Sequence, residues 1–252
     1  MGKNLENKVA LVTGGSRGLG AVIAAALADE GADVAISYVA SDAKAAAVVE
    51  GLKAKGVRAF AFKNDQGDPG QAPALIAAVI EKLGKIDILV NNAAIAIQGL
   101  TIDDPAYDSA IMDRQWAINT MGVIANIRAV ARHLPEEGRI ITVSSGLARR
   151  VGWPGAADYA GTKAAVTGFS RGVARDLGPR KITVNVVEAG IMETDMTMAI
   201  APDGIPPALL GIMAIGRTAQ LEEVAAAVTF LATPAASYIT GSAIEANGGA
   251  LA

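Results

Sequence analysis

The 252-residue sequence contains no cysteine and a single histidine, His133, and these shortages exclude several kinds of chemistry. Without cysteine the chain has no disulfide, no thiolate nucleophile and no cysteine-ligated zinc site. One histidine leaves a single candidate base for a Ser-His-Asp triad. His133 ends a helical stretch just before Leu134-Pro135, so we interpret it as a structural residue near a helix end. We predict no metal site and no hydrolase triad.

An excess of charge of one sign is also missing. Twenty-two basic and 25 acidic residues give a net charge of -3, so we expect no nucleic-acid partner. The uncharged run 224–244 is long enough to span a bilayer, but Pro234, Thr240 and Gly241 favour a helix, a break and a strand. The opening segment MGKNLENK is polar and does not resemble a signal peptide. We expect a cytoplasmic protein with no membrane partner.

Apolar residues are abundant, at 52% of the chain, and there are 28 glycines. Short β-branched runs, apolar throughout, alternate with alanine-rich helical stretches, which is typical of a parallel sheet covered on both faces. The predicted strands are Val9–Thr13, Asp33–Ser37, Val57–Phe62, Ile86–Val90, Arg139–Ser144, Ile182–Val187 and Ser242–Ala246. The predicted helices include Leu19–Glu30, Asp42–Lys55, Gly70–Leu83 and Ala157–Leu177. We predict an α/β fold: a single domain over 1–252, Rossmann-like, with a doubly wound sheet of about seven mostly parallel strands flanked by helices.

A glycine cluster directly follows the first predicted strand, in the order Thr13-Gly14-Gly15-Ser16-Arg17-Gly18-Leu19-Gly20, and a helix comes next. Glycines in this position allow a tight turn and let backbone N–H groups approach a pyrophosphate, and the helix N-terminus favours an anion. The spacing differs from the general GxGxxG fingerprint. The cluster therefore predicts a dinucleotide-phosphate loop.

Further motifs follow in order along the chain: Asn91-Asn92-Ala93-Ala94, Asn119, Ser144-Ser145, Tyr159-Ala-Gly-Thr-Lys163, Gly190 to Thr194 and the ending ITGSAIEANGGALA. With the glycine loop, they make the chain resemble the short-chain dehydrogenase/reductase family over nearly its whole length. The resemblance is greatest to 3-oxoacyl-carrier-protein reductases and related ketoreductases. It implies a nicotinamide cofactor and a homotetramer.

The choice of dinucleotide depends on the end of the second strand, where an acidic residue would bind the ribose of NAD. By the family pattern this position is Tyr38, while Arg17 can pair with a 2′-phosphate and Ser37 or Ser41 can donate a hydrogen bond. A solvated surface charge is the alternative for Arg17. We therefore predict NADP(H) in preference to NAD(H), and interpret Asp42 as a cap of the next helix. The resemblance implies adenine contact by Asp65, for which a plain turn residue is the alternative, and nicotinamide contact by Thr194. The full set of cofactor residues that it implies is Gly14, Ser16, Arg17, Gly18, Leu19, Gly20, Tyr38, Ser41, Asp65, Gln66, Asn91, Ala93, Tyr159, Lys163, Gly190, Met192 and Thr194.

Tyr159 and Lys163 are four residues apart, so a helix places them on one face. A free tyrosine has a pKa of about 10, and a nearby ammonium is expected to lower it. The resemblance implies that Tyr159 protonates the substrate carbonyl, that Lys163 binds the nicotinamide ribose, and that Asn119 holds a water for proton relay. It also implies a serine that polarises the carbonyl. We favour Ser145 and keep Ser144 as the alternative, because the spacing to Tyr159 differs from the usual one by one residue.

The substrate is predicted from a single segment of the chain. Residues 191–216 contain three prolines and one run of apolar side chains, and we interpret them as a lid or insertion. The apolar run either packs at a subunit contact or lines a pocket, and our hypothesis is a pocket for apolar ketones. We thus predict NADPH-dependent reduction of a small-molecule ketone to a secondary alcohol. The alternatives are a 3-oxoacyl-carrier-protein reductase of fatty acid synthesis, a noncatalytic dinucleotide-binding sensor, and an epimerase or dehydratase of the related extended family. Ala94, Glu188-Ala189 and Asn247 depart from the family pattern near the site.

Overall fold

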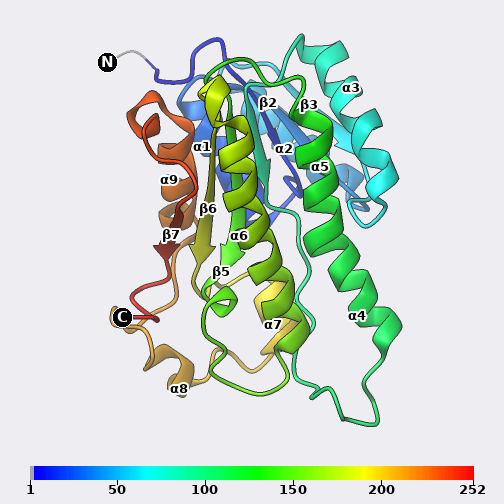
Figure 1. Cartoon of the computed structure of the whole chain (residues 1–252), viewed down its shortest axis with the longest axis vertical. Coiled ribbons are helices and arrows are strands. Elements are labelled where there is room, and N and C mark those ends of the chain that lie inside the picture. Colours follow the sequence, from blue (N-terminus) through cyan, green and yellow to red (C-terminus); the bar gives the residue numbers. More distant parts are fainter. Residues whose placement is uncertain (1–2) are drawn as a thin grey trace.

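The computed structural model describes residues 3–252, and it confirms the predicted α/β fold. Seven strands, all parallel, form one sheet in the order β3-β2-β1-β4-β5-β6-β7 (Figure 1). The strands are β1 (Val9–Val12), β2 (Asp33–Tyr38), β3 (Ala59–Lys63), β4 (Ile88–Asn91), β5 (Arg139–Ser145), β6 (Thr183–Ala189) and β7 (Ala243–Ala246).

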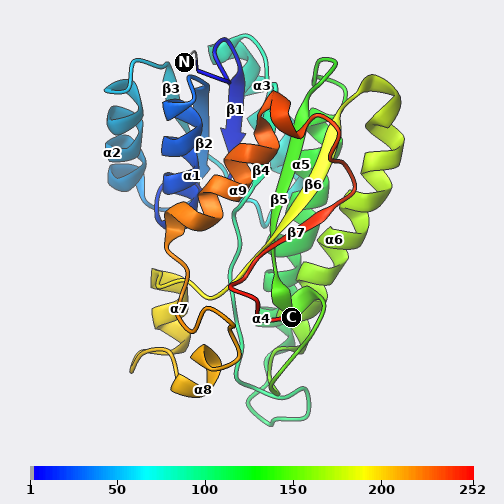
Figure 2. The ribbon, with the colours of Figure 1, turned by 90° about the vertical axis from the view of Figure 1, so that its left-hand side faces the viewer.

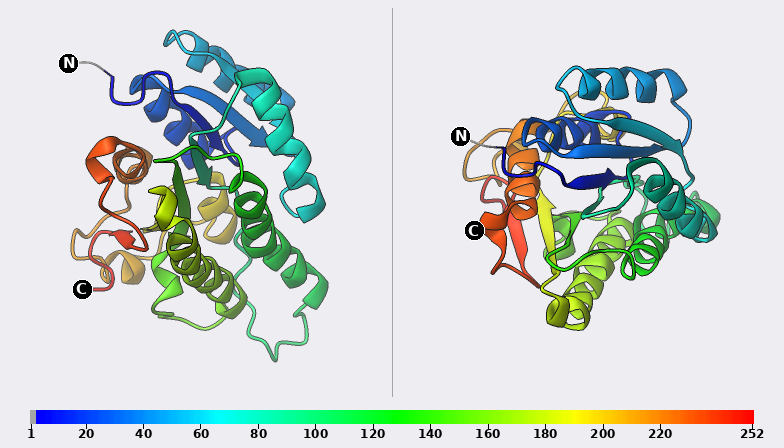
Figure 3. Two further views of the ribbon diagram at one scale, coloured as in Figure 1. Left: turned by 45° about the horizontal axis from the view of Figure 1, so that its top comes forward. Right: turned by 90° about the horizontal axis from the view of Figure 1, so that it is seen from above.

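Helices cover both faces of the sheet, as Figures 2 and 3 show from two sides. The helices are α1 (Gly18–Asp29), α2 (Asp42–Lys53), α3 (Ala72–Leu83), α4 (Ser109–Trp116), α5 (Gly122–Val130), α6 (Ala157–Leu177), α7 (Asp195–Ile200), α8 (Pro207–Leu210) and α9 (Leu221–Ala232). One core packs α1, α2 and α9 against the sheet, and a second packs α3, α5 and α6 against its other face. The strands between these two cores are buried on both sides, which explains why they are apolar throughout.

The predicted bounds of the strands and helices lie within two residues of those in the structure. The helix expected from Gly70 begins at Ala72, because the Asp68 side chain accepts a hydrogen bond from the Gly70 N–H and caps a short 3-10 turn, Pro69–Gln71. The strand expected from Val57 begins at Ala59. Within residues 3–252, no helix combines the length and the apolar character needed to cross a membrane.

The predicted lid, 191–216, holds the two short helices α7 and α8, which lie beyond the carboxyl ends of the strands (Figure 2). Two turns outside the α-helices also matter for the site. A π-helical turn, η2 (Ala117–Met121), joins α4 to α5, and a 3-10 turn, η3 (Gly146–Ala148), follows β5.

Candidate active site

The predicted site residues follow the carboxyl ends of the strands. Strands β1 and β4 are neighbours, but the chain leaves β1 toward β2 and leaves β4 toward β5. A crevice for a ligand forms where the connections diverge in this way. The glycine loop after β1 and the Asn91-Asn92-Ala93 segment after β4 lie on its two sides.

The glycine loop is held tightly between β1 and α1. Gly14 has a φ of +66°, and a Cβ there would lie 2.9 Å from the Ala93 Cα. A Cβ on Gly20 would collide with the Gly14 carbonyl oxygen, so α1 can approach the loop only with glycine at this position. The Thr13 Oγ1 accepts hydrogen bonds from the N–H groups of Asn92 (3.1 Å) and Ala93 (3.0 Å), which fixes the loop to the end of β4.

The N-terminus of α1 faces this loop with unpaired donors. The first N–H groups of a helix have no partner inside it. Arg17 precedes the helix without a side-chain capping bond, and the first turn holds no acidic residue. The predicted contacts Gly18 and Leu19 are in this turn, Leu19 with its side chain in the core. This arrangement suits a bound phosphate, because backbone donors and the helix dipole both favour an anion there.

The predicted 2′-phosphate residues lie in a strongly charged region. The Arg17 guanidinium pairs with the Asp195 carboxylate of α7 at 3.1 Å, and Lys44 Nζ lies 3.9 Å from the same carboxylate. The Tyr38 hydroxyl is hydrogen-bonded to Asp42, which raises the pKa of Tyr38. No sequence pattern indicated that Asp195, from the lid, would meet Arg17.

The expectation that Asp42 caps α2 is wrong. The residue at the cap position is Ser41, and its side chain makes no capping bond. Asp42 lies one residue further on, where Tyr38 binds it and Lys63 Nζ lies 3.7 Å away. Tyr38 at the end of β2 and Lys63 at the end of β3 thus both lie next to the Asp42 carboxylate.

Asp65, the predicted adenine contact, binds an arginine in the structure. Arg114 of α4 donates to both of its carboxylate oxygens, at 2.6 and 2.7 Å, and the Gly67 N–H donates at 2.9 Å. Partial burial raises the pKa of Asp65, but these hydrogen bonds outweigh it and the net pKa is lowered. The pairing spans 49 residues, and no local spacing in the sequence signals it.

The side chains of Gln66 and Asn91 point into the protein. Gln66 Nε2 donates to the carbonyls of Ala93 and Ile118, both at 2.9 Å, and Asn126 donates to its Oε1 at 3.1 Å. Asn91 is buried, and its Oδ1 lies 3.5 Å from the same Asn126 amide. These two residues therefore tie the segments that follow β3 and end β4 to α5 and to each other.

The structure brings Tyr159, Lys163 and Ser145 together. The first two lie on α6, and Ser145 is the last residue of β5. Lys163 is 4% exposed, and its Nζ donates to the Val143 carbonyl at 3.1 Å and lies 5.6 Å from the centre of the Tyr159 ring. Ser145 lies close enough to the Tyr159 hydroxyl to lower the pKa of Tyr159.

The expected lowering of the Tyr159 pKa is wrong for this structure. Burial raises the pKa of Tyr159 to about 12, and the nearby Ser145 side chain lowers it only in part. Burial also lowers the pKa of Lys163 to about 8. The two shifts have one cause, because a low-dielectric environment disfavours phenolate and ammonium alike.

The two adjacent serines have different surroundings. Ser144 donates to the Lys163 carbonyl at 3.1 Å and accepts from Thr167 at 3.2 Å, so it is buried against α6. Ser145 accepts from the Leu147 N–H at 3.3 Å and faces Tyr159. Only Ser145 is thus placed beside the tyrosine hydroxyl.

Asn119 lies in the π-helical turn η2, a kind of irregularity that recurs at functional sites. Its Oδ1 accepts from the Ile95 N–H at 2.9 Å, and its Nδ2 donates to the Ile95 carbonyl at 2.8 Å. It also donates to Thr162 on α6 at 3.3 Å. Asn119 therefore joins the loop after β4 to the helix that carries Tyr159.

Gly190 and Thr194 follow β6. A Cβ on Gly190 would lie 2.7 Å from the Asn247 Cα, so the chain passes close to the C-terminal segment. Thr194 caps α7, with its Oγ1 accepting from the Thr197 N–H at 3.2 Å, and Thr197 in turn donates to the Met192 carbonyl at 2.6 Å. The lid is thus anchored at its start.

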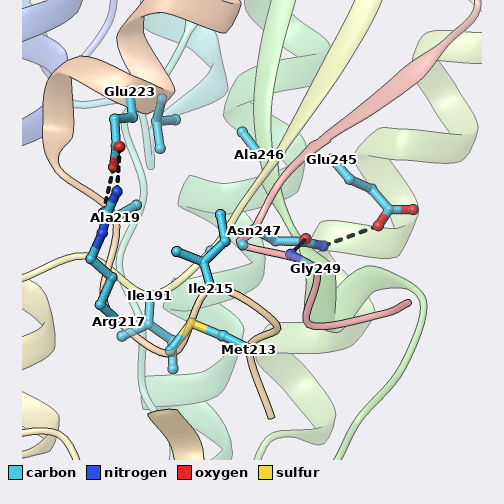
Figure 4. Close-up of a pocket in the computed structure, with 13 residues that line it drawn as sticks. Ile191, Met213, Ile215, Arg217, Ala219, Glu223, Glu245, Ala246, Asn247 and Gly249 are labelled. Carbon is cyan, nitrogen blue, oxygen red and sulfur yellow. Dashed lines mark hydrogen bonds and ion pairs between the residues drawn. The ribbon is translucent and has the colours of Figure 1, made fainter. Parts of the chain in front are cut away.

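A cavity of about 320 Å³ lies beside Gly190, between the lid, α9 and the C-terminal segment (Figure 4). Ile191, Met213 and Ile215 line it, and the ion pair of Arg217 with Glu223, at 2.7 Å, borders it. The predicted catalytic residues do not line this cavity. Of the predicted cofactor residues, Gly190 lines it.

The chain is similar over nearly its whole length to known proteins. The family described as Enoyl-(Acyl carrier protein) reductase matches residues 14–250. The 3-oxoacyl-[acyl-carrier-protein] reductase FabG of Staphylococcus aureus is 40% identical over 248 residues, with 96% of this chain and 97% of that protein covered. A short-chain dehydrogenase from Burkholderia cenocepacia, crystallised with NADP, is 44% identical with a TM-score of 0.91, over 99% of this chain and 100% of that one. The angucycline C-6 ketoreductase LanV with bound NADP is 36% identical with a TM-score of 0.89, over 98% and 97%.

Proposed function

Because the chain belongs to the short-chain dehydrogenase/reductase family, we propose that it is an NADP(H)-dependent ketoreductase, which reduces a ketone to a secondary alcohol and also runs in reverse. The observation that carries this proposal is the cluster of Tyr159, Lys163 and Ser145 at the carboxyl ends of the strands. The relatives crystallised with NADP and the relatives named as reductases support it.

The residues around the glycine loop fit a dinucleotide. Any side chain on Gly20 would fill the space in which the loop approaches α1, and the α1 N-terminus presents donors without a competing carboxylate in its first turn. Ser16 lies in the glycine loop, and Gly18 is the first residue of α1. Bound there, the nicotinamide supplies the hydride.

The roles proposed for the side chains follow from their protonation states. A pKa of about 12 keeps Tyr159 protonated near neutral pH, so its hydroxyl holds a proton for the carbonyl oxygen of a ketone. Ser145 donates a hydrogen bond to the same oxygen and orients it. Lys163 with a pKa of about 8 is mainly an ammonium at neutral pH, and it binds the nicotinamide ribose and favours the negative charge that develops when Tyr159 gives up its proton. Asn119 holds a water for the return of that proton.

NADP(H) is proposed over NAD(H) because the end of β2 carries Tyr38 rather than a carboxylate, with Arg17 and Lys44 close by. A 2′-phosphate would replace Asp195 as the partner of Arg17, since a dianionic phosphate accepts more hydrogen bonds from a guanidinium than a single exposed carboxylate.

Apolar ketones are the proposed substrates. The lid exposes large apolar side chains beyond the carboxyl ends of the strands, among them Met196, Met198 and Ile200 of α7. Methionines adapt to ligands of varied shape. The second candidate is a 3-oxoacyl-carrier-protein reductase, which the 40% identity to FabG favours. A noncatalytic sensor would not need Tyr159 and Lys163 together.

The test is consumption of NADPH, followed by near-ultraviolet absorbance, with a panel of aryl ketones, alkyl ketones and an acyl-carrier substrate. We expect turnover of the simple ketones. A rate on the acyl-carrier substrate far above that on all of them would favour the second candidate, and no turnover of any would favour the sensor. The homotetramer, the cytoplasmic location and the single domain with a lid at 191–216 stay predictions, which sedimentation, cell fractionation and limited proteolysis test.

A further inference from the structure

Asp158, the residue directly before Tyr159, has both carboxylate oxygens bound by aromatic side chains. The Tyr107 hydroxyl donates to Oδ2 at 2.7 Å, and the Trp116 indole N–H donates to Oδ1 at 2.8 Å. The two donors come from different elements, Tyr107 from the loop after β4 and Trp116 from the end of α4. Asp158 thus joins three segments at the start of α6.

No side chain at the cap position binds the N-terminus of α6. Ala156 occupies the cap position and makes no side-chain capping bond, so the first N–H groups of α6 have no side chain from that position to satisfy them. Asp158 itself lies in the first turn, where its charge interacts favourably with the helix dipole, but this interaction does not fix the direction of the turn. The orientation of the first turn, which carries Tyr159, must therefore come from tertiary contacts.

The Trp116 ring supplies a second such contact. A Cβ on Gly161 would lie 2.9 Å from the Trp116 Cζ2, so the indole packs directly on the α6 backbone at a position open only to glycine. Thr162, the next residue, accepts from Asn119 at 3.3 Å and donates to the Tyr159 carbonyl at 2.7 Å. Contacts from the α4–η2 segment therefore surround the first turn of α6.

We propose that Asp158, held by Tyr107 and Trp116, is a positioning residue that fixes the Tyr159 hydroxyl relative to Ser145 and the substrate carbonyl. This rests on the proposed role of Tyr159 as proton donor. Asp158 acts through backbone geometry rather than charge, because Tyr159 takes its pKa from burial and Ser145. The same contacts also connect the loop after β4 to the catalytic helix.

The chemistry of the two donors provides a sharp test. An indole N–H can only donate, whereas a tyrosine hydroxyl donates or accepts. In Asp158→Asn the amide oxygen can therefore keep the bond from Trp116, while the amide NH2 donates to the Tyr107 hydroxyl. Asp158→Asn retains both contacts without the charge, and Asp158→Ala loses both.

The experiment compares steady-state reduction of a ketone by the full chain and its variants. For Asp158→Ala we expect kcat to fall by about 10- to 100-fold, the scale of a misplaced catalytic group, with little change in the KM for NADPH. Asp158→Asn should recover kcat to within about 3-fold, with an unchanged pH profile, because the geometry is kept. Asp176→Ala, at an exposed aspartate near the other end of α6, is the matched control.

Two results would overturn the proposal: full activity in Asp158→Ala, or an Asp158→Asn variant as impaired as Asp158→Ala. If Asp158→Ala does not fold, Tyr107→Phe replaces it, and we expect a lower kcat in this variant. The double variant Tyr107→Phe/Asp158→Asn should have a lower kcat still, since the amide NH2 of the asparagine then has no partner. Equal activity of these two would also overturn it. Tyr159→Phe in the same series separates the two proposals, because its full activity would contradict the role of Tyr159 itself.

Discussion

The Lys163 ammonium lies 5.6 Å from the centre of the Tyr159 ring, with Lys163 buried and Tyr159 half-buried. Burial lowers the pKa of Lys163 to about 8 and raises that of Tyr159 to about 12. Both shifts keep the two residues closer to neutral than they are in water.

A first prediction concerns stability against pH. The pKa of Lys163 falls from its ordinary 10.5 to about 8 on folding, so between these values the unfolded state binds more protons than the folded one. Stability then rises with pH in this window. Lys163→Met lacks this titrating group, so it serves as the reference. We expect the unfolding free energy of the wild type to rise, relative to that of Lys163→Met, by about 2 kcal/mol from roughly pH 7 to roughly pH 9.5. Urea unfolding across this range measures it, and a difference that does not change with pH would contradict it.

A second prediction concerns the glycine loop. Gly20→Ala should abolish NADPH binding or folding, because the new Cβ would collide with the Gly14 carbonyl. Gly51→Ala, in α2 with open space around it, is the control. It should stabilise the protein by about 0.5–1 kcal/mol, since alanine is the better helix former. Thermal unfolding and NADPH titration of both variants test this, and normal cofactor binding by Gly20→Ala would be the contrary result.

A third prediction concerns cofactor choice. Arg17→Gln should raise the KM for NADPH by about 10-fold, with little effect on NADH, since one charge-assisted bond to the 2′-phosphate is lost. Asp195→Asn should lower the KM for NADPH by about 2-fold, because exposed ion pairs such as that of Arg17 with Asp195 are worth under about 1 kcal/mol. Equal effects of Arg17→Gln on both cofactors would argue against the 2′-phosphate contact.

A fourth prediction concerns Glu188, which departs from the family pattern. Its side chain is fully buried, and Arg149 Nε lies 2.7 Å from its Oε2 while Arg149 also binds Glu245 at 2.8 Å. Arg149→Met should destabilise the protein by about 1–3 kcal/mol, because it leaves a buried carboxylate without its partner while the exposed Arg149 is screened by water. The double variant Arg149→Met/Glu188→Ala should recover part of this loss in urea unfolding. An Arg149→Met variant as stable as the wild type would contradict a stabilising role for the ion pair of Arg149 with Glu188.

The sequence predicted the sheet well because its strands are buried on both faces and are therefore apolar throughout. Helix α6, Ala157–Leu177, was predicted to the residue. A helical stretch ending at His133 was expected, and the structure has α5 end at Val130. No bounds were predicted for α4 or α5, since the π-helical turn between them breaks the regular period of apolar residues at Asn119.

The site was predictable where a motif is local and less so where it depends on distant residues. The spacing of Tyr159 and Lys163 placed both on α6. The binding of Asp65 by Arg114, and of Asp158 by Tyr107 and Trp116, joins residues more than 40 positions apart. The sign of the Tyr159 pKa shift was missed for a similar reason, because burial depends on the whole fold rather than on a neighbouring lysine.

The most direct test of the account is Tyr159→Phe, which removes one hydroxyl and leaves the packing of the ring. We expect the variant to fold, to bind NADPH with the wild-type Kd in a fluorescence titration, and to lose kcat for ketone reduction by at least about 100-fold, the scale of general acid catalysis. A kcat within a few-fold of the wild type, with NADPH binding intact, would contradict the proposal that Tyr159 supplies the proton.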